Sequence, residues 1–263
     1  MTGSHRPAVK KYNSGFTLIE IAMVLFIVTL LMAGLLPTIK VQMEQQRTNE
    51  TRKQLSEIKE ALIGYAVIYG RLPCPASSTS NGAEDPVGGG NCTHFYDGFV
   101  PAATLGLSGT DNSGFAVDSW NNRIHYAVAS WDSSTPFLSK VFTTSNGMRI
   151  VGISNLAASG SPFLQVCSTA STSSSDCSVA GSKLTSNPGV PVVIYSTGKN
   201  GKYSGTGTDE AENPNPNSAD NDRIYVSHVP SSSGATNGEF DDLVIWISTN
   251  ILVNRMVSAG KLP

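Results

Sequence analysis

An unbroken apolar stretch near the N-terminus dominates the hydrophobic pattern of this chain. Residues 16–39 read FTLIEIAMVLFIVTLLMAGLLPTI, and Glu20 is the only charged residue among them. The 19 uncharged residues between Glu20 and Lys40 would span about 28 Å as a helix, which matches the hydrocarbon core of a bilayer. This pattern predicts one transmembrane helix at about 16–39.

A second, amphipathic pattern follows the apolar stretch. Apolar residues recur at spacings of three and four in a charged background, at Leu55, Ile58, Leu62, Tyr65 and Ile68. The pattern stops at Gly70 and at the two prolines of LPCP, residues 72–75, which end a helix. We therefore expect a stem helix over 16–69, whose second half packs on a globular domain at 70–263.

Short apolar runs separated by turn residues occupy that domain. They lie at 118–128, 148–153, 163–167, 190–196, 223–226 and 243–247. Such runs predict an antiparallel sheet, interrupted by irregular insertions at 168–176 and 198–222. Residues 248–259 permit a short helix that ends at Gly260. The expected fold class is α+β, with the stem helix packed on an antiparallel sheet with long loops.

Composition narrows the functional classes. Hydrophobic residues make up 40% of the chain, enough to bury a core, whereas the formal net charge of -2 gives no reason to expect nucleic acid as a partner. Arg6, Lys10 and Lys11 precede the apolar stretch. The positive-inside rule therefore places the N-terminus in the cytoplasm and the domain at 70–263 on the other side of the membrane.

The four cysteines favour disulfides over a metal or redox motif. Cys74, Cys92, Cys167 and Cys177 all lie beyond the apolar stretch, and none belongs to a C-x-x-C pair. Loop-closure entropy favours the local pairs, Cys74 with Cys92 and Cys167 with Cys177, over crossed pairs or free thiols. An even number of cysteines fits an oxidising compartment such as a periplasm.

The junction between the basic N-terminus and the apolar stretch carries a motif. The run GFTLIE from Gly15 to Glu20 resembles the G-F-T-L-x-E processing site of type IV prepilins and of the pseudopilins of type II secretion. The resemblance implies cleavage between Gly15 and Phe16, which removes a leader at 1–15, and methylation of the new N-terminus at Phe16. It also implies that the helix is retained, with a kink at Pro37.

The same resemblance implies the type IV pilin fold and a set of partners. These are prepilin peptidase, other pilin or pseudopilin subunits bound through the N-terminal helix, the inner-membrane assembly platform and membrane lipid. The implied location is the bacterial inner membrane, with a single span and a periplasmic domain, followed by an extracellular pilus or a periplasmic pseudopilus.

The Glu20 carboxylate costs free energy at its position in the apolar stretch. A carboxylate at the centre of a bilayer costs roughly 2.5 to 3.5 kcal/mol, and less near the edge, so Glu20 requires a partner. A pair of unit charges ~4 Å apart gains about 4 kcal/mol at an effective dielectric near 20, before desolvation. Our hypothesis is that Glu20 pairs with the Phe16 amine of a neighbouring subunit. The alternative is a lone carboxylate that reaches the membrane interface.

A second resemblance lies further along the chain. LPCP at 72–75, P-x-x-x-L-G-L at 101–107 and D-x-W-N-N-R at 118–123 are similar to segments of large prepilin-like proteins. Pseudopilins have D-x-W-G, and Asn121 stands where they have Gly. Asn adopts positive φ less readily than Gly, which puts the same tight turn in doubt. The resemblance implies that Trp120 is buried against the stem.

The insertion at 198–222 holds the densest group of oxygen ligands. Asp209, Glu210, Glu212, Asn213, Asp220 and Asp222 are the candidate ligands. Carboxylate and amide oxygens suit Ca²⁺, although the spacing is not that of an EF-hand. Major pseudopilins carry calcium in a comparable loop, but their motif is not reproduced here residue by residue. The alternative is a solvated acidic loop without a metal.

Nothing in the sequence indicates catalysis. His94, His125 and His228 are scattered, and no G-x-S-x-G or H-E-x-x-H motif occurs. We therefore expect a structural subunit of a filament, a minor type IV pilin, that contributes to adhesion, motility or DNA uptake. A type II secretion pseudopilin is the main alternative, and a membrane-anchored periplasmic enzyme is a lower one.

Overall fold

The computed structural model describes residues 15–134, 137–156, 163–201, 207–213 and 222–262. For residues 33–38 it describes the backbone only. Residues 1–14 of the predicted leader at 1–15 and the candidate ligand Asp220 lie outside the described residues. The chain divides into two compact units, one that ends at Gln46 and one that begins at Arg47.

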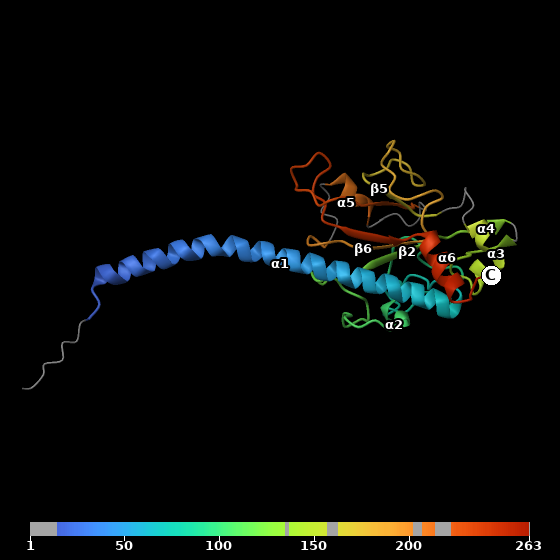
Figure 1. Ribbon diagram of the computed structural model, residues 1–263, viewed down its shortest axis with the longest axis horizontal. Coiled ribbons are helices and arrows are strands. Elements are labelled where there is room, and N and C mark those ends of the chain that lie inside the picture. Colours follow the sequence, from blue (N-terminus) through green and yellow to red (C-terminus); the bar gives the residue numbers. More distant parts are fainter. Residues whose placement is uncertain (1–14, 135–136, 157–162, 202–206, 214–221, 263) are drawn as a thin grey trace, which may run out of the picture. The chain divides into compact units, whose positions relative to one another are not determined.

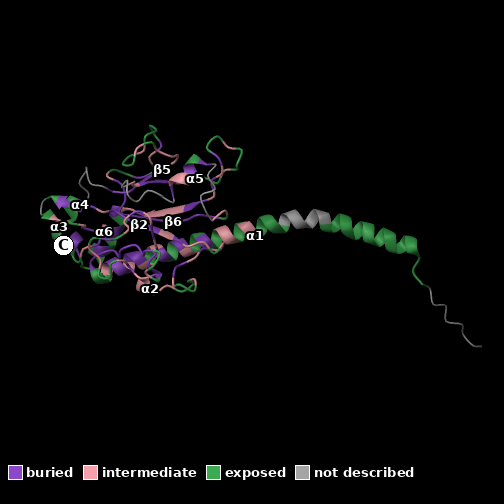
Figure 2. Cartoon of the chain, turned by 180° about the vertical axis from the view of Figure 1, so that it is seen from behind, coloured by how far each residue is buried: buried purple, intermediate pink, exposed green. Residues whose placement is uncertain are grey.

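The fold begins with helix α1, Leu18–Tyr69, which is unbroken over 52 residues (Figure 1). It ends where the amphipathic pattern ends, at Gly70, whose φ of 68° is left-handed. The described side chains from 15 to 32 are all exposed, and most are apolar (Figure 2). The first unit therefore offers an apolar surface that its own side chains do not bury.

Within the described residues, no helix has an apolar stretch long enough to cross a membrane. The expected span at 16–39 includes residues 33–38, and Pro37 among them, whose side chains are outside the description.

The second unit is built on a four-stranded antiparallel sheet. Its order is β1 (Gly98–Phe99), β2 (His125–Val128), β6 (Val192–Ser196) and β8 (Leu243–Ile247). In the register of the central strands, Ile194 lies opposite Tyr126 on one side and Ile245 on the other. Together with the N-terminal helix, this sheet confirms the predicted α+β class.

The second half of α1 packs into the same core as this sheet. Leu55, Ile58 and Leu62 are buried there, as the spacing predicts. Ile68 is mostly exposed, so the buried face is shorter than expected. Helix α6 (Thr249–Ser258) adds Leu252 to the core, and its first turn is capped by the side chain of Ser248.

Three predictions about strands were wrong in whole or in part. Residues 148–153 form no strand, because helices α3 (Gly147–Val151) and α4 (Ile153–Leu156) occupy this stretch. Met148 and Val151 face the core while Ile150 is exposed, and a spacing of three is helical.

The second error concerns the pairing of β5 (Gln165–Cys167) with β7 (Ile224–Val226), which is parallel. The long connection between these strands allows the parallel direction, which a tight hairpin cannot give. The remaining elements are short: β3 (Ser133–Ser134), β4 (Phe137–Leu138), α2 (Ala102–Leu105) and α5 (Thr208–Glu212).

The segment 118–124 is a turn, and only His125–Val128 of the predicted strand is one. Asn121 adopts a φ of 70°, so it takes the left-handed conformation that glycine would supply. The Asp118 carboxylate supports the turn, because it accepts hydrogen bonds from the backbone N–H of Trp120 and Asn122 at 2.9 and 2.8 Å. Trp120 is half-buried against the core rather than fully buried.

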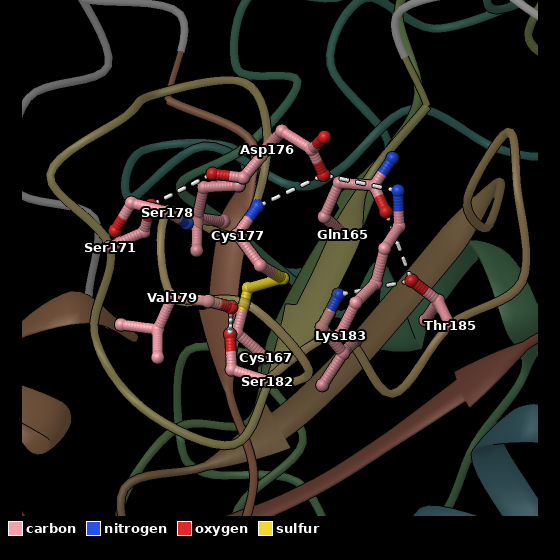
Figure 3. Close-up of a disulfide and its surroundings, with 12 residues drawn as sticks. Gln165, Cys167, Ser171, Asp176, Cys177, Ser178, Val179, Ser182, Lys183 and Thr185 are labelled. Atoms are coloured by element: carbon pink, nitrogen blue, oxygen red, sulfur yellow. Dashed lines mark hydrogen bonds and ion pairs between the residues drawn. A yellow bond between two sulfur atoms is a disulfide. The ribbon is translucent and has the colours of Figure 1, made fainter.

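Two disulfides join the local cysteine pairs that loop closure favours. Cys74 bonds to Cys92 and Cys167 bonds to Cys177. The second bond closes the serine-rich loop that follows β5 (Figure 3). Beside it, Asp176 forms an ion pair with Lys183 at 3.0 Å across the mouth of the loop. Covalent closure therefore anchors a loop that contributes little to the core.

A buried ion pair links the end of the stem to the first disulfide loop. Both terminal nitrogens of the Arg71 guanidinium donate to the Glu84 carboxylate at 2.7 Å, and the Tyr65 hydroxyl also donates to it. Backbone N–H groups of Cys74 and Gly88 also donate to this carboxylate. Burial raises the pKa of Glu84, but the hydrogen bonds and the charge of Arg71 outweigh it and hold the pKa below its usual range.

We expect Glu84→Gln to lower the free energy of unfolding by about 3 to 5 kcal/mol at pH 7, because it leaves a buried guanidinium without its counter-charge. Since the folded pKa of Glu84 is depressed, its contribution is complete above the unfolded value near 4.5 and is lost as the pH falls through the folded pKa. Urea denaturation from pH 7 to pH 3 measures both effects.

Glu57→Gln is the matched control for this prediction, because Glu57 lies on the same stem but is exposed, in a surface pair with Lys53. It should change stability by less than about 0.5 kcal/mol. Equal stabilities of the two variants at pH 7 would contradict the proposed role of the buried pair.

Candidate functional site

The N-terminal motif sits at the start of α1. Thr17 precedes the helix, and its hydroxyl accepts a hydrogen bond from the backbone N–H of Glu20 at 3.3 Å. The order Thr-x-x-Glu is that of a capping box, in which the first and fourth residues satisfy the free N–H groups of a helix start. The Thr17 hydroxyl therefore supplies the first half of this arrangement and caps the start of α1.

The candidate calcium ligands do not converge as a set. Helix α5 carries Asp209, Glu210 and Glu212, and Asn213 follows it. Of these, only Glu210 joins a group of carboxylates, with Asp241 and Asp242 immediately before β8.

Asp209 is engaged elsewhere. Its carboxylate accepts hydrogen bonds from the Thr169 hydroxyl at 2.9 Å, the Ala170 backbone N–H at 2.7 Å and the Asn237 amide at 2.9 Å. The His228 ring lies 3.2 Å from the same carboxylate. Asp209 thus connects α5 to the disulfide-closed loop.

Asn213 also connects two elements of the fold. Its amide exchanges two hydrogen bonds with the backbone of Val226, at 3.0 and 2.7 Å, and so binds α5 to β7. Asp222 accepts the Ile224 N–H at 2.9 Å at the start of β7. Burial and the charge of Asp222 raise the pKa of Glu212 to about 7. The structure brings neither Glu212 nor Asp222 into the carboxylate group, and Asn213 reaches it only as a donor to Asp242.

The carboxylate group of Glu210, Asp241 and Asp242 is compact and buried. One oxygen from each residue lies within 4.8 Å of the others. Glu210 is 2% exposed and Asp242 4% exposed, while Asp241 is half-buried. We call these three residues and Asn200, which contacts Glu210, the oxygen cluster.

Each carboxylate of the oxygen cluster is oriented by donors to one of its two oxygens. Asp241 Oδ2 accepts the backbone N–H groups of Lys199 and Asn200 at 2.9 and 3.2 Å. Asp242 Oδ2 accepts the Asn213 amide at 2.7 Å, and Glu210 Oε1 accepts the Asn200 amide.

The second oxygen of each carboxylate accepts no hydrogen bond from the described residues. Glu210 Oε2, Asp241 Oδ1 and Asp242 Oδ1 are buried and have no hydrogen-bond partner in the described part of the protein. Asn200 Oδ1 is in the same condition, although the amide nitrogen of that side chain donates to Glu210. Buried polar atoms normally have partners, so four such oxygens at one place require an explanation.

The carboxylates of the oxygen cluster also have raised pKa values. Burial is the largest cause that raises the pKa of Glu210, Asp241 and Asp242, and neighbouring negative charges raise it further. Glu239 acts in this way on Glu210 and Asp241. Across the described ranges, no lysine or arginine forms an ion pair with any of the three. Negative charge is concentrated here, and no cation among the described residues pairs with it.

The loop at 198–201 approaches the Asp241 backbone closely. Gly198 has a φ of 62°, and a Cβ there would stand 2.4 Å from the Asp241 carbonyl oxygen. Only glycine allows this approach, which brings the N–H groups of Lys199 and Asn200 to the Asp241 carboxylate.

Sequence reasoning found Glu210 but missed Asp241 and Asp242. The signal was present as two adjacent acidic residues directly before the apolar run of β8, in a chain with only 14% charged residues. Their distance in sequence from Glu210 concealed that they meet it in space.

Comparison with known proteins concerns the other end of the chain. The family model described as the prokaryotic N-terminal methylation motif matches residues 10–36. The chain carries a prepilin-type N-terminus. This confirms the resemblance drawn from Gly15, Phe16 and Glu20, which all lie in the matched segment. No curated protein and no solved structure matches the chain.

The hydrogen bonds of Asp209 lead to a stability prediction. Asp209→Asn should lower the free energy of unfolding by about 1.5 to 3 kcal/mol, because it removes a charged acceptor and turns a donor toward the Asn237 amide. Thermal and urea unfolding measure the loss. Asp176→Asn is the control, since Asp176 is exposed in its pair with Lys183 and should change stability by less than about 1 kcal/mol.

Proposed function

We propose that this protein is a prepilin that becomes a structural subunit of a filament, as a minor type IV pilin. Prepilin peptidase removes residues 1–15 and methylates Phe16, and the helix then anchors the subunit in the bacterial inner membrane with its domain in the periplasm. The observation that carries the proposal is the methylation motif at 10–36 at the start of a continuous helix.

The surface of the first unit supports this proposal. Apolar side chains such as Leu25, Phe26 and Leu30 are more than half exposed. Each Å² of apolar surface left in water costs roughly 25 cal/mol, so this surface requires a covering environment. Lipid supplies that environment before assembly, and the helices of neighbouring subunits supply it in the filament.

The second unit supports a structural role beyond the inner membrane. Two disulfides and a buried ion pair connect segments of this unit. Disulfides persist in an oxidising compartment, which agrees with a periplasmic and then extracellular domain. In this proposal the domain presents surface for adhesion, motility or DNA uptake and performs no catalysis.

A pseudopilin of a type II secretion system is the second candidate, because it uses the same N-terminal processing. The mature chain of 248 residues favours a large minor pilin. Deletion of the gene separates the two: loss of pili with normal export of secreted enzymes supports the first, and accumulation of those enzymes in the periplasm supports the second.

Processing is tested on the native protein. Mass spectrometry of the protein purified from membranes should give a methylated N-terminal Phe16, because the peptidase cleaves after Gly15 and modifies the amine that it releases. Gly15→Val should instead leave the uncleaved chain that begins at residue 1. An N-terminus after residue 36 in the native protein would overturn the proposal.

Assembly depends on Glu20 in the proposed mechanism. If its carboxylate pairs with the Phe16 amine of a neighbour, Glu20→Ala should be processed normally but reduce incorporation into sheared filaments by at least about tenfold, which corresponds to 1.4 kcal/mol. Immunoblots of sheared filaments and of membranes measure the two pools.

Glu50→Ala is the matched control for assembly, because Glu50 is an exposed carboxylate on the same helix. It should enter filaments as the parent chain does. Normal incorporation of Glu20→Ala would refute the pairing while leaving the processing result intact.

A further inference from the structure

We propose that the outer edge of strand β8 binds an extended segment of a second protein, which adds one strand to the main sheet and places an acidic residue beside Lys59. The site is a groove of about 300 Å³ along β8, between α1 and the start of α6. It is lined by Lys59, Val244, Ile245, Trp246, Ser248 and Ile251. The choice of a second protein as the occupant rests on the proposed function, whereas the properties of the edge do not.

The two edges of the main sheet differ. At the β1 edge, Phe99 exchanges two backbone hydrogen bonds with Ala76, at 2.8 and 2.9 Å, so this edge is covered. At the other edge β8 pairs with β6, and no described residue pairs with its outer side. Edge strands are normally protected by charged residues, proline or a bulge. Strand β8 reads LVIWI and keeps an unbroken register with β6, so it has none of these protections.

The hydrogen-bond pattern identifies the backbone groups on the outer side of β8. Ala129 of the β2 side donates to the Pro191 carbonyl opposite it at 2.9 Å, so β6 bonds to β2 through its odd-numbered residues. The even-numbered residues of β6 therefore bond to β8, and the register makes their partners the odd-numbered residues of β8. The backbone N–H and C=O groups of Val244 and Trp246 point outward, in the extended geometry that an added strand requires.

The side chains along this edge favour an apolar strand with an acidic end. The three central residues of β8 are half-buried, so both faces of the strand leave apolar surface that a partner can cover. Lys59 is half-buried in the groove and forms no ion pair with any described residue. The adjacent Glu60 is already paired with Arg255, at 3.7 Å. The Lys59 ammonium therefore favours a carboxylate on the bound segment.

A second copy of this chain fits the edge poorly. Among the described strands of the main sheet its open edge is again β8, and two β8 strands related by a two-fold axis pair antiparallel. The second half of α1 runs lengthwise along the strands (Figure 1), so this axis would reverse it in one copy. The two stems would then leave the pair in opposite directions, whereas subunits anchored in one membrane share one direction. A segment of a second protein is free of this constraint.

The test uses the full chain in detergent and a synthetic peptide of about eight residues, in which valine and threonine alternate between a glutamate at each end. We expect saturable binding of one peptide per chain, measured by the anisotropy of a fluorescein label. The emission of Trp246 should shift to shorter wavelength, because the peptide removes its indole from water.

The control peptide has the same sequence with N-methyl groups on alternate amides. It should bind at least about tenfold more weakly, because it cannot complete the strand. Absence of binding by the first peptide, or equal binding by the two, would contradict strand addition.

Variants locate the edge. Val244→Pro removes an outward N–H and no bond to β6, so it should weaken binding at least about tenfold. Lys59→Glu should weaken binding of the glutamate peptide and strengthen binding of a peptide with lysine at each end, a reversal that does not depend on the proline variant. Lys53→Glu, on an exposed part of the same helix, should do neither. Full binding by both Val244→Pro and Lys59→Glu would place the peptide elsewhere and refute this edge.

Sedimentation of the full chain without peptide tests the other occupant. We expect no association through β8. A dimer that Val244→Pro dissociates would show that a second copy occupies the edge, and the choice of a second protein would be wrong. These outcomes are separate from those of the proposed function, because cleavage after Gly15 and incorporation into filaments are measured without the peptide.

Discussion

The packing of the second half of α1 against the antiparallel sheet is the interaction on which the second unit depends. Leu55 and Leu62 have no exposed surface, and they share one core with Tyr126 and Ile194 of the central strands. The part of the same helix that lies in the first unit is apolar and exposed. One continuous element thus changes its environment along its length, from a surface that requires other molecules to a surface that its own chain covers.

Around that core, several carboxylates connect segments of the chain by accepting hydrogen bonds from them. Glu84 receives a guanidinium and two backbone N–H groups, and Asp118 fixes the turn at Asn121. Asp209 receives donors from three segments. The oxygen cluster differs from these, because its members use half of their accepting capacity and leave the rest facing no donor in the described chain.

The parts of the structure that follow from local physics were predictable. The stem ends at Tyr69 because periodicity, Gly70 and two prolines agree, and the cysteines pair locally as loop closure favours. The parallel direction of β5 and β7 was not predictable from short apolar runs, since it depends on the path of the connection. The convergence of Glu210 with Asp241 and Asp242 likewise exists only in three dimensions, and no spacing along the chain encodes it.

The disulfide between Cys74 and Cys92 has a mechanical consequence. It lies just after the stem helix and bridges a sequence separation of 18 residues. An extended residue spans at most about 3.3 to 3.6 Å, so the chain between the two cysteines could extend to roughly 60 Å. The disulfide prevents this extension when force is applied along the stem. Under tension, the load would therefore pass through a short covalent path into the sheet, and the loop would stay folded while the force is applied.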